Sequence, residues 1–155
     1  MAGRIDAKLA ELGIALPTPA APVATYVPYV QTGSLVIISG QLPVVDGKVS
    51  ATGKLGTAVP VEQGQQAAQR CFINVLAQLK EACGGDLDRV RRVVRLGGFI
   101  ACIPEFTQQA QVMNGASDLA IAVFGESGRH ARTTIGVAAL PLDAAVEVEG
   151  MFEIL

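Results

Sequence analysis

The sequence is poor in charged residues, in aromatic residues and in histidine. Charged residues make up 17% of the 155 positions, aromatic residues make up 5%, and histidine occurs once. A monomer with so few charges would expose apolar surface, so we expect the chain to associate with further copies of itself. The net charge of -2 provides no general attraction for phosphate backbones or anionic lipids. The composition therefore favours a homo-oligomer and disfavours nucleic acid and membrane surfaces as partners.

The sequence also lacks a disulfide framework and a membrane-spanning segment. The cysteines are odd in number, have no CxxC spacing and lie in apolar sequence, as is typical of reduced, buried thiols: Cys71, Cys83 and Cys102. Residues 12–45 carry no charge, but the prolines in this run, among them Pro17, Pro19, Pro22 and Pro28, exclude a lipid-exposed helix. No long apolar block precedes a cleavage site at the N-terminus, so we expect a cytoplasmic protein.

The first half of the chain predicts a short helix, several strands and a long helix. Apolar residues at helical spacing in residues 3–12 predict an amphipathic helix that ends at Gly13. Residues 24–53 are rich in β-branched and aromatic residues and contain turn signals at Thr32-Gly33 and Asp46-Gly47. Residues 60–83 follow the helical period up to a stop at Gly84-Gly85.

The second half predicts a strand, a helix and two more strands. Residues 88–104 are rich in β-branched residues and predict a strand, and Pro104 is a suitable first position for a second long helix that ends at Gly125. Strands follow at about residues 132–139 and 146–154. One α+β domain over residues 1–155 accounts for this order, with two long helices covering one face of a single mixed sheet.

One stretch near the C-terminus contains candidate chemistry. On a strand, Arg132, Thr134 and Gly136 share one face, so we expect Arg132 to point outward beside a hydroxyl and an open space. A guanidinium there could form two parallel hydrogen bonds to a carboxylate. Glu147 and Glu149 also share a face, and either could pair with Arg132 or transfer protons. The same charges could equally be ion pairs on the solvated face of a sheet.

Five short blocks carry a family resemblance. They are "PYVQTG" (28–33), "SGQLPV" (39–44), "VMN" (112–114), "AR" followed by "LP" (131–141) and "VEVE" (146–149). With them the sequence resembles the YjgF/RidA family of reactive-intermediate deaminases, also called endoribonuclease L-PSP proteins. The resemblance runs from about residue 24 to the end and leaves residues 1–23 as an N-terminal extension. It implies a chorismate-mutase-like fold and a homotrimer with ligand clefts between subunits.

The resemblance also implies an activity and a set of site residues. Such proteins hydrolyse enamines and imines, for example 2-aminoacrylate, to 2-oxo acids and ammonia. By motif, Arg132 would clamp the substrate carboxylate and Glu147 would orient or activate water. The cleft would be lined by Tyr29, Ser39, Gly40, Asn114 and Thr134. This chemistry needs no metal or organic cofactor, and the sequence has no zinc-ligand cluster, P-loop or GxGxxG motif.

Two positions depart from the family pattern: Thr134 stands where many relatives carry cysteine, and His130 stands where proline or alanine is frequent. Two other functions stay open. A non-catalytic module could bind a small carboxylate in the same cleft. An endoribonuclease could use the arginines, of which Arg89, Arg91 and Arg95 would share a face of a strand, but a single histidine provides no paired acid and base.

Overall fold

A computed structural model describes residues 2–19, 21–22 and 24–155; residues 1, 20 and 23, which belong to the predicted N-terminal extension, lie outside the described residues. The helices are α1 (Arg4–Glu11), α2 (Val61–Ala82) and α3 (Gln109–Phe124). The strands are β1 (Tyr29–Thr32), β2 (Leu35–Gln41), β3 (Val44–Val45), β4 (Lys48–Val49), β5 (Val90–Ala101), β6 (Ala131–Val137) and β7 (Val146–Ile154). Three short 3-10 turns are η1 (Leu87–Arg89), η2 (Gly125–Gly128) and η3 (Pro141–Asp143).

Five strands form one mixed sheet in the order β1-β2-β7-β5-β6. β5 and β6 are parallel, whereas the other neighbours in this sheet are antiparallel. β3 and β4 form a separate hairpin, whose turn residues Asp46 and Gly47 both have positive φ. The predicted single mixed sheet and the predicted turn are thus confirmed.

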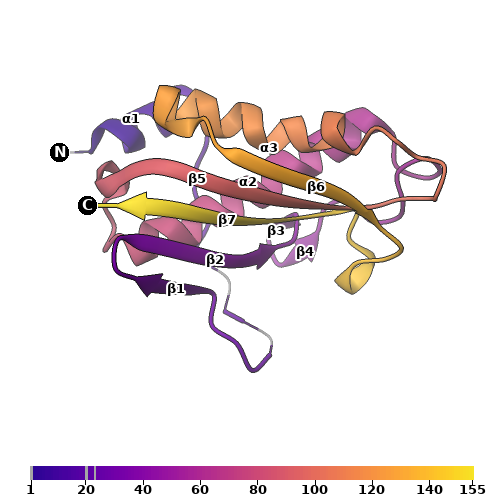
Figure 1. Cartoon of the computed structure of the whole chain (residues 1–155), viewed down its shortest axis with the longest axis horizontal. Coiled ribbons are helices and arrows are strands. Elements are labelled where there is room, and N and C mark those ends of the chain that lie inside the picture. Colours follow the sequence, from indigo (N-terminus) through magenta and orange to yellow (C-terminus); the bar gives the residue numbers. More distant parts are fainter. Residues whose placement is uncertain (1, 20, 23) are drawn as a thin grey trace.

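Both long helices pack on the same face of this sheet (Figure 1). The apolar sides of α2, with Phe72, and of α3, with Met113, are buried in one core with Leu96 and Phe152 of the central strands. The opposite face has no helix over it among the described residues, and Ile37 and Ile135 there are 41% and 47% exposed. The structure confirms the predicted α+β layers and leaves an apolar sheet face uncovered within one chain.

The second long helix begins later than predicted, at Gln109 rather than at Pro104. The backbone N–H of Ile103 donates to the carbonyl of Leu55, which keeps the chain extended beyond the end of β5. The side chain of Gln109 then donates to the carbonyl of Phe106 at 2.7 Å and closes a turn ahead of the helix. Long-range pairing therefore overrides the local preference of Pro104 for a helix start.

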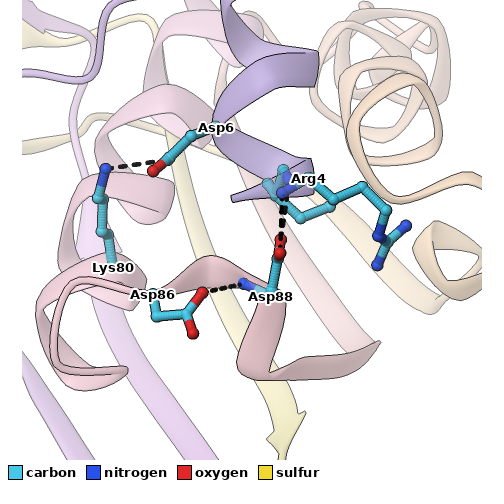
Figure 2. A network of polar contacts seen from close by, with 6 residues as sticks. Arg4, Asp6, Lys80, Asp86 and Asp88 are labelled. Atoms are coloured by element: carbon cyan, nitrogen blue, oxygen red, sulfur yellow. Dashed lines mark hydrogen bonds and ion pairs between the residues drawn. The ribbon is translucent and has the colours of Figure 1, made fainter. Parts of the chain in front are cut away.

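The predicted N-terminal helix is present as α1 and is held against the domain by charged side chains (Figure 2). Its apolar residues Ile5 and Leu9 are buried. The carboxylate of Asp88 accepts hydrogen bonds of 2.8 Å from the backbone N–H groups of Arg4 and of Ile5. These groups have no partner within the helix, and their two bonds to the carboxylate lower the pKa of Asp88. Asp88 thus supplies the N-terminal cap that α1 lacks in its own sequence.

The cysteines lie largely as expected. Cys71 and Cys83 are buried, Cys102 is half-buried, and all three are free thiols. Burial raises the pKa of Cys71 well above its ordinary value, with a smaller contribution from the charge of Glu147. In the described part of the chain, every helix is too short or too polar to cross a bilayer.

Candidate functional site

The seven predicted site residues fall into two groups on different strands. The arginine cluster lies at the β6 edge of the sheet and consists of Arg132, Thr134 and, from α3, Asn114. The glutamate cluster lies on the other side of β5, on β7, β2 and β1, and consists of Glu147, Ser39, Gly40 and Tyr29. One chain therefore does not bring all of the predicted residues together.

Arg132 and Glu147 also lie on opposite faces of the sheet. In the strand register Arg132 lies beside Leu96, which is fully buried under the helices, whereas Glu147 lies beside Phe99 on the open face. Adjacent residues in neighbouring strands point to the same side, so β5 fixes both directions. The prediction that Arg132 points outward is wrong, because it lies on the face that α3 covers. Neither glutamate pairs with it inside the chain.

The guanidinium of Arg132 is held by α3. Its Nη1 donates to Asn114 Oδ1 at 2.8 Å and to Ser117 Oγ at 3.1 Å, while Nη2 donates to the carbonyl of Ala110 at 3.4 Å. A guanidinium has five N–H donors. The Nε–H and one Nη2–H thus have no partner among the described residues. Together they can bind a carboxylate side-on.

A hydroxyl from Thr134 and an open space over Gly136 were expected beside Arg132, and the structure has the hydroxyl but not the space. The expected open space above Gly136 is filled, because a Cβ there would lie 2.7 Å from Cys102 Sγ and 3.0 Å from Gln109 Nε2. Thr134 Oγ1 is buried and has no hydrogen-bond partner among the described residues. A buried hydroxyl left unpaired is costly, so this position is suited to a ligand, water or a second subunit.

Glu147 is an unpaired carboxylate on the open face. Its side chain lies over Gly40, where an added Cβ would overlap the carboxylate oxygen. Within the described chain Glu147 makes no ion pair or hydrogen bond, whereas Glu149 forms an ion pair with Arg95 at 3.6 Å. Burial and, secondarily, the neighbouring charge of Glu149 raise the pKa of Glu147. The two glutamates of the same motif are therefore in different electrostatic environments.

Ser39 and Tyr29 border the glutamate cluster. The Ser39 hydroxyl donates to the carbonyl of Val27 at 2.8 Å, which leaves its oxygen free to accept a hydrogen bond. Tyr29 lies opposite Ile38 in the β1-β2 ladder and packs partly against the core. Ser39 adjoins Gly40 in β2, whereas Tyr29, paired with the buried Ile38, points to the helix-covered face and away from Glu147.

The arginines proposed for an endoribonuclease do not form one surface. Arg89 belongs to η1, where it donates to the carbonyls of Cys83 and Leu155. Two irregularities in the β5-β7 pairing interrupt the alternation of side chains between the two faces. Arg92 and Arg95 pair with residues of β7, whereas Arg91 falls in an irregularity and has no paired residue there. The prediction that Arg89, Arg91 and Arg95 share a face is wrong, because it assumed an unbroken strand.

The sequence interpretation missed Ser117, and it treated His130 only as a departure from the family pattern. Ser117 lies three residues after Asn114, so both occupy the same side of α3 and both reach Arg132. That helical spacing is the signal that could have identified Ser117. Its hydroxyl is also 2.9 Å from His130 Nε2. As for metals, no group of three or more potential ligands occurs among the described residues.

Comparisons with known proteins agree with this arrangement of elements. A family model described as "YjgF/chorismate mutase-like, putative endoribonuclease" matches residues 6–154. The chain is 51% identical to Protein TCP17 of Trypanosoma cruzi over 153 residues, covering 98% of this chain and 95% of that protein. It is 32% identical to a 2-iminobutanoate/2-iminopropanoate deaminase of Dermatophagoides farinae, with coverage of 89% and 92%.

Solved structures are similar over the same length. The crystal structure of the protein Atu1372 from Agrobacterium tumefaciens has a TM-score of 0.92 and 48% sequence identity, covering 97% of this chain and 92% of that one. With the family match and the relatives above, the chain belongs to the YjgF/RidA family, which has the chorismate-mutase-like fold.

Proposed function

We propose that the protein hydrolyses small enamines and imines of amino-acid metabolism to 2-oxo acids and ammonia. The observation that carries the proposal is the guanidinium of Arg132, which α3 holds along one edge while two N–H groups on another edge stay unpaired in the described chain. Such a fork fits the carboxylate that these substrates share. The 32% identity to a 2-iminobutanoate/2-iminopropanoate deaminase supports the same substrate class.

The catalytic unit in this proposal is a homotrimer with the clefts between subunits. Arg132 and Glu147 lie on opposite faces of the sheet, so one chain cannot present both to the same ligand. In a ring, the arginine cluster of one subunit meets the glutamate cluster of the next, and each interface completes one cleft. The uncovered apolar sheet face would be buried in the same assembly.

The proposed reaction needs one positioned water. Arg132 holds the carboxylate, Glu147 takes a proton from water, and the water oxygen bonds to the imine carbon. That proton passes to nitrogen to give a carbinolamine. The carbinolamine hydroxyl then loses its proton, through Glu147, to nitrogen as the C–N bond breaks, and a 2-oxo acid and ammonia leave. A carboxylate with a raised pKa is a stronger base than an ordinary one, and positioned proton transfer gives roughly 100- to 10,000-fold acceleration.

The experiment that tests this proposal follows release of 2-oxo acid while an amino-acid oxidase or lyase generates defined imines. Faster release with the protein than without it supports the proposed hydrolase. Binding of the 2-oxo acid without any acceleration would instead support a non-catalytic carboxylate-binding module. A protein that neither binds nor accelerates would contradict both functions.

A further inference from the structure

A chain of hydrogen bonds extends from Arg132 through two side chains that the proposed reaction does not use. Ser117 on α3 is 9% exposed, and its Oγ lies 3.1 Å from Arg132 Nη1 and 2.9 Å from His130 Nε2. The other ring nitrogen of His130, Nδ1, lies 2.6 Å from the carbonyl oxygen of Gly128 in η2. We infer that Ser117 and His130 are positioning residues that hold the Arg132 guanidinium ready for its carboxylate ligand. This inference rests on the proposed function.

The two ends of the chain determine where each hydrogen lies. A carbonyl only accepts, so Nδ1 of His130 carries the hydrogen and, in the neutral ring, Nε2 accepts. A guanidinium only donates, so the Ser117 oxygen accepts from Arg132 and its hydroxyl donates to His130. Each donor then has one acceptor, and a single tautomer of His130 satisfies the whole chain.

This arrangement orients the guanidinium as well as providing acceptors for its N–H groups. Asn114 and Ser117 both accept from Nη1, from positions one helical turn apart on α3. These two acceptors, with the longer bond from Nη2 to the carbonyl of Ala110, fix the plane of the guanidinium, and loss of Ser117 would leave Nη1 with one hydrogen bond. The carboxylate then meets a fork that is already ordered, and binding costs less side-chain entropy.

The local fold explains why His130 reaches Ser117. His130 comes directly before β6 and two residues before Arg132, so both side chains point to the α3 side of the sheet. Gly128 lies so close to α3 that a Cβ on it would overlap the carbonyl of Ala120. η2 therefore brings its carbonyl to the end of α3, and His130 links η2 to the helix.

A spectroscopic experiment tests the hydrogen arrangement in the unmodified protein. His130 is the only histidine in the chain, so its ring nitrogens are assigned without ambiguity in a proton–nitrogen NMR spectrum. When the ring is neutral we expect hydrogen on Nδ1 and none on Nε2. A neutral ring with its hydrogen on Nε2 would overturn the inference.

A binding experiment tests the consequence for the ligand, with 2-oxobutanoate as the probe. Ser117→Ala and His130→Ala should each weaken binding roughly 2- to 10-fold, as expected for one lost hydrogen bond. The double variant should bind no more weakly than Ser117→Ala, because His130 acts through Ser117. Hydrolysis should show a raised KM with little change in kcat. Ser127→Ala, at an exposed position, is the matched control.

Arg132→Ala separates failure of this inference from failure of the proposed function. If Arg132→Ala binds the acid as well as the parent does, the clamp itself is wrong. If Arg132→Ala loses binding while Ser117→Ala and His130→Ala bind like Ser127→Ala, the positioning role is wrong and the clamp stands. Additive losses in the double variant would also overturn the positioning role.

Discussion

Among single residues, Arg132 should be sensitive to geometry as well as to charge. Its remaining N–H donors form a fork, and a lysine ammonium keeps the charge but cannot reproduce two parallel hydrogen bonds. Arg132→Lys and Arg132→Ala should therefore both raise KM, by roughly 10- to 100-fold for the lysine variant. Steady-state kinetics check this, with light scattering to verify unchanged assembly. Parent-like kinetics in Arg132→Lys would mean that only charge matters.

Glu147 and Glu149 should differ in effect although they are the same residue type two positions apart. Glu147→Gln should retain 2-oxo acid binding but lower kcat about 100-fold or more, because an amide cannot take the proton. Glu149→Gln should cost at most about 1 kcal/mol of stability, since it breaks an exposed ion pair with Arg95. Equal losses of turnover in both variants would contradict a single positioned base.

The same pair predicts a shift in pH dependence. A general base works when ionised, and the pKa of Glu147 is raised, so turnover should fail on acidification at a higher pH than for an ordinary glutamate. Burial is the larger cause and the charge of Glu149 the smaller one. Glu149→Gln should therefore move the acid limb of kcat modestly to lower pH. An unmoved limb would show that Glu149 does not act on the base.

At the level of elements, the β2-β7 ladder positions Glu147 through the absence of a side chain at Gly40. A Cβ there would overlap the carboxylate, so Gly40→Ala should displace Glu147 and lower kcat by up to about 100-fold. It should also destabilise the fold by about 1–3 kcal/mol. Denaturant unfolding checks this, and adding Glu147→Ala should remove most of the stability cost. A cost that persists would place the clash elsewhere.

α1 should detach on acidification or on loss of Asp88. The pKa of Asp88 is lowered by the bonds from Ile5 and Arg4, so the stabilisation it provides exists above its unfolded-state pKa. It is lost as pH falls through the lower folded-state value. Hydrogen exchange of residues 4–11 should become fast in Asp88→Ala at neutral pH, but not in Glu11→Gln, whose ion pair with Lys8 lies within α1. Protected amides in Asp88→Ala would refute the cap.

Helices and strands were predictable from the sequence where neighbouring residues alone determine them. Residues 60–83 show an unbroken helical period and a glycine stop, and α2 follows that pattern closely. The start of α3 was not predictable, because pairing with Leu55, distant in sequence, keeps residues near Ile103 extended. The prediction that Arg132 points outward was wrong for a similar reason. Alternation identifies which residues share a face, but only the register with β5 shows which face the helices cover.

For the whole molecule, the site residues were identified by motif, but their division between two faces belongs to the tertiary structure. The family blocks provide Arg132 and Glu147 without indicating that β5 separates them. A complete cleft therefore requires assembly: a trimer of about 48 kDa, three times the chain mass of 16.0 kDa, would complete three clefts. A concentration-independent monomer in light scattering would leave every cleft incomplete.

Mixed trimers test most directly whether each cleft takes Arg132 from one subunit and Glu147 from its neighbour. Arg132→Ala and Glu147→Gln chains, each strongly impaired alone at substrate concentrations below the parent KM, are co-expressed in equal amounts, and native mass spectrometry verifies that both occur in the same trimers. Random mixing gives an intact Arg132 next to an intact Glu147 at about one interface in four, so about a quarter of the parent activity should return. Verified mixed trimers that stay inactive would contradict the shared cleft.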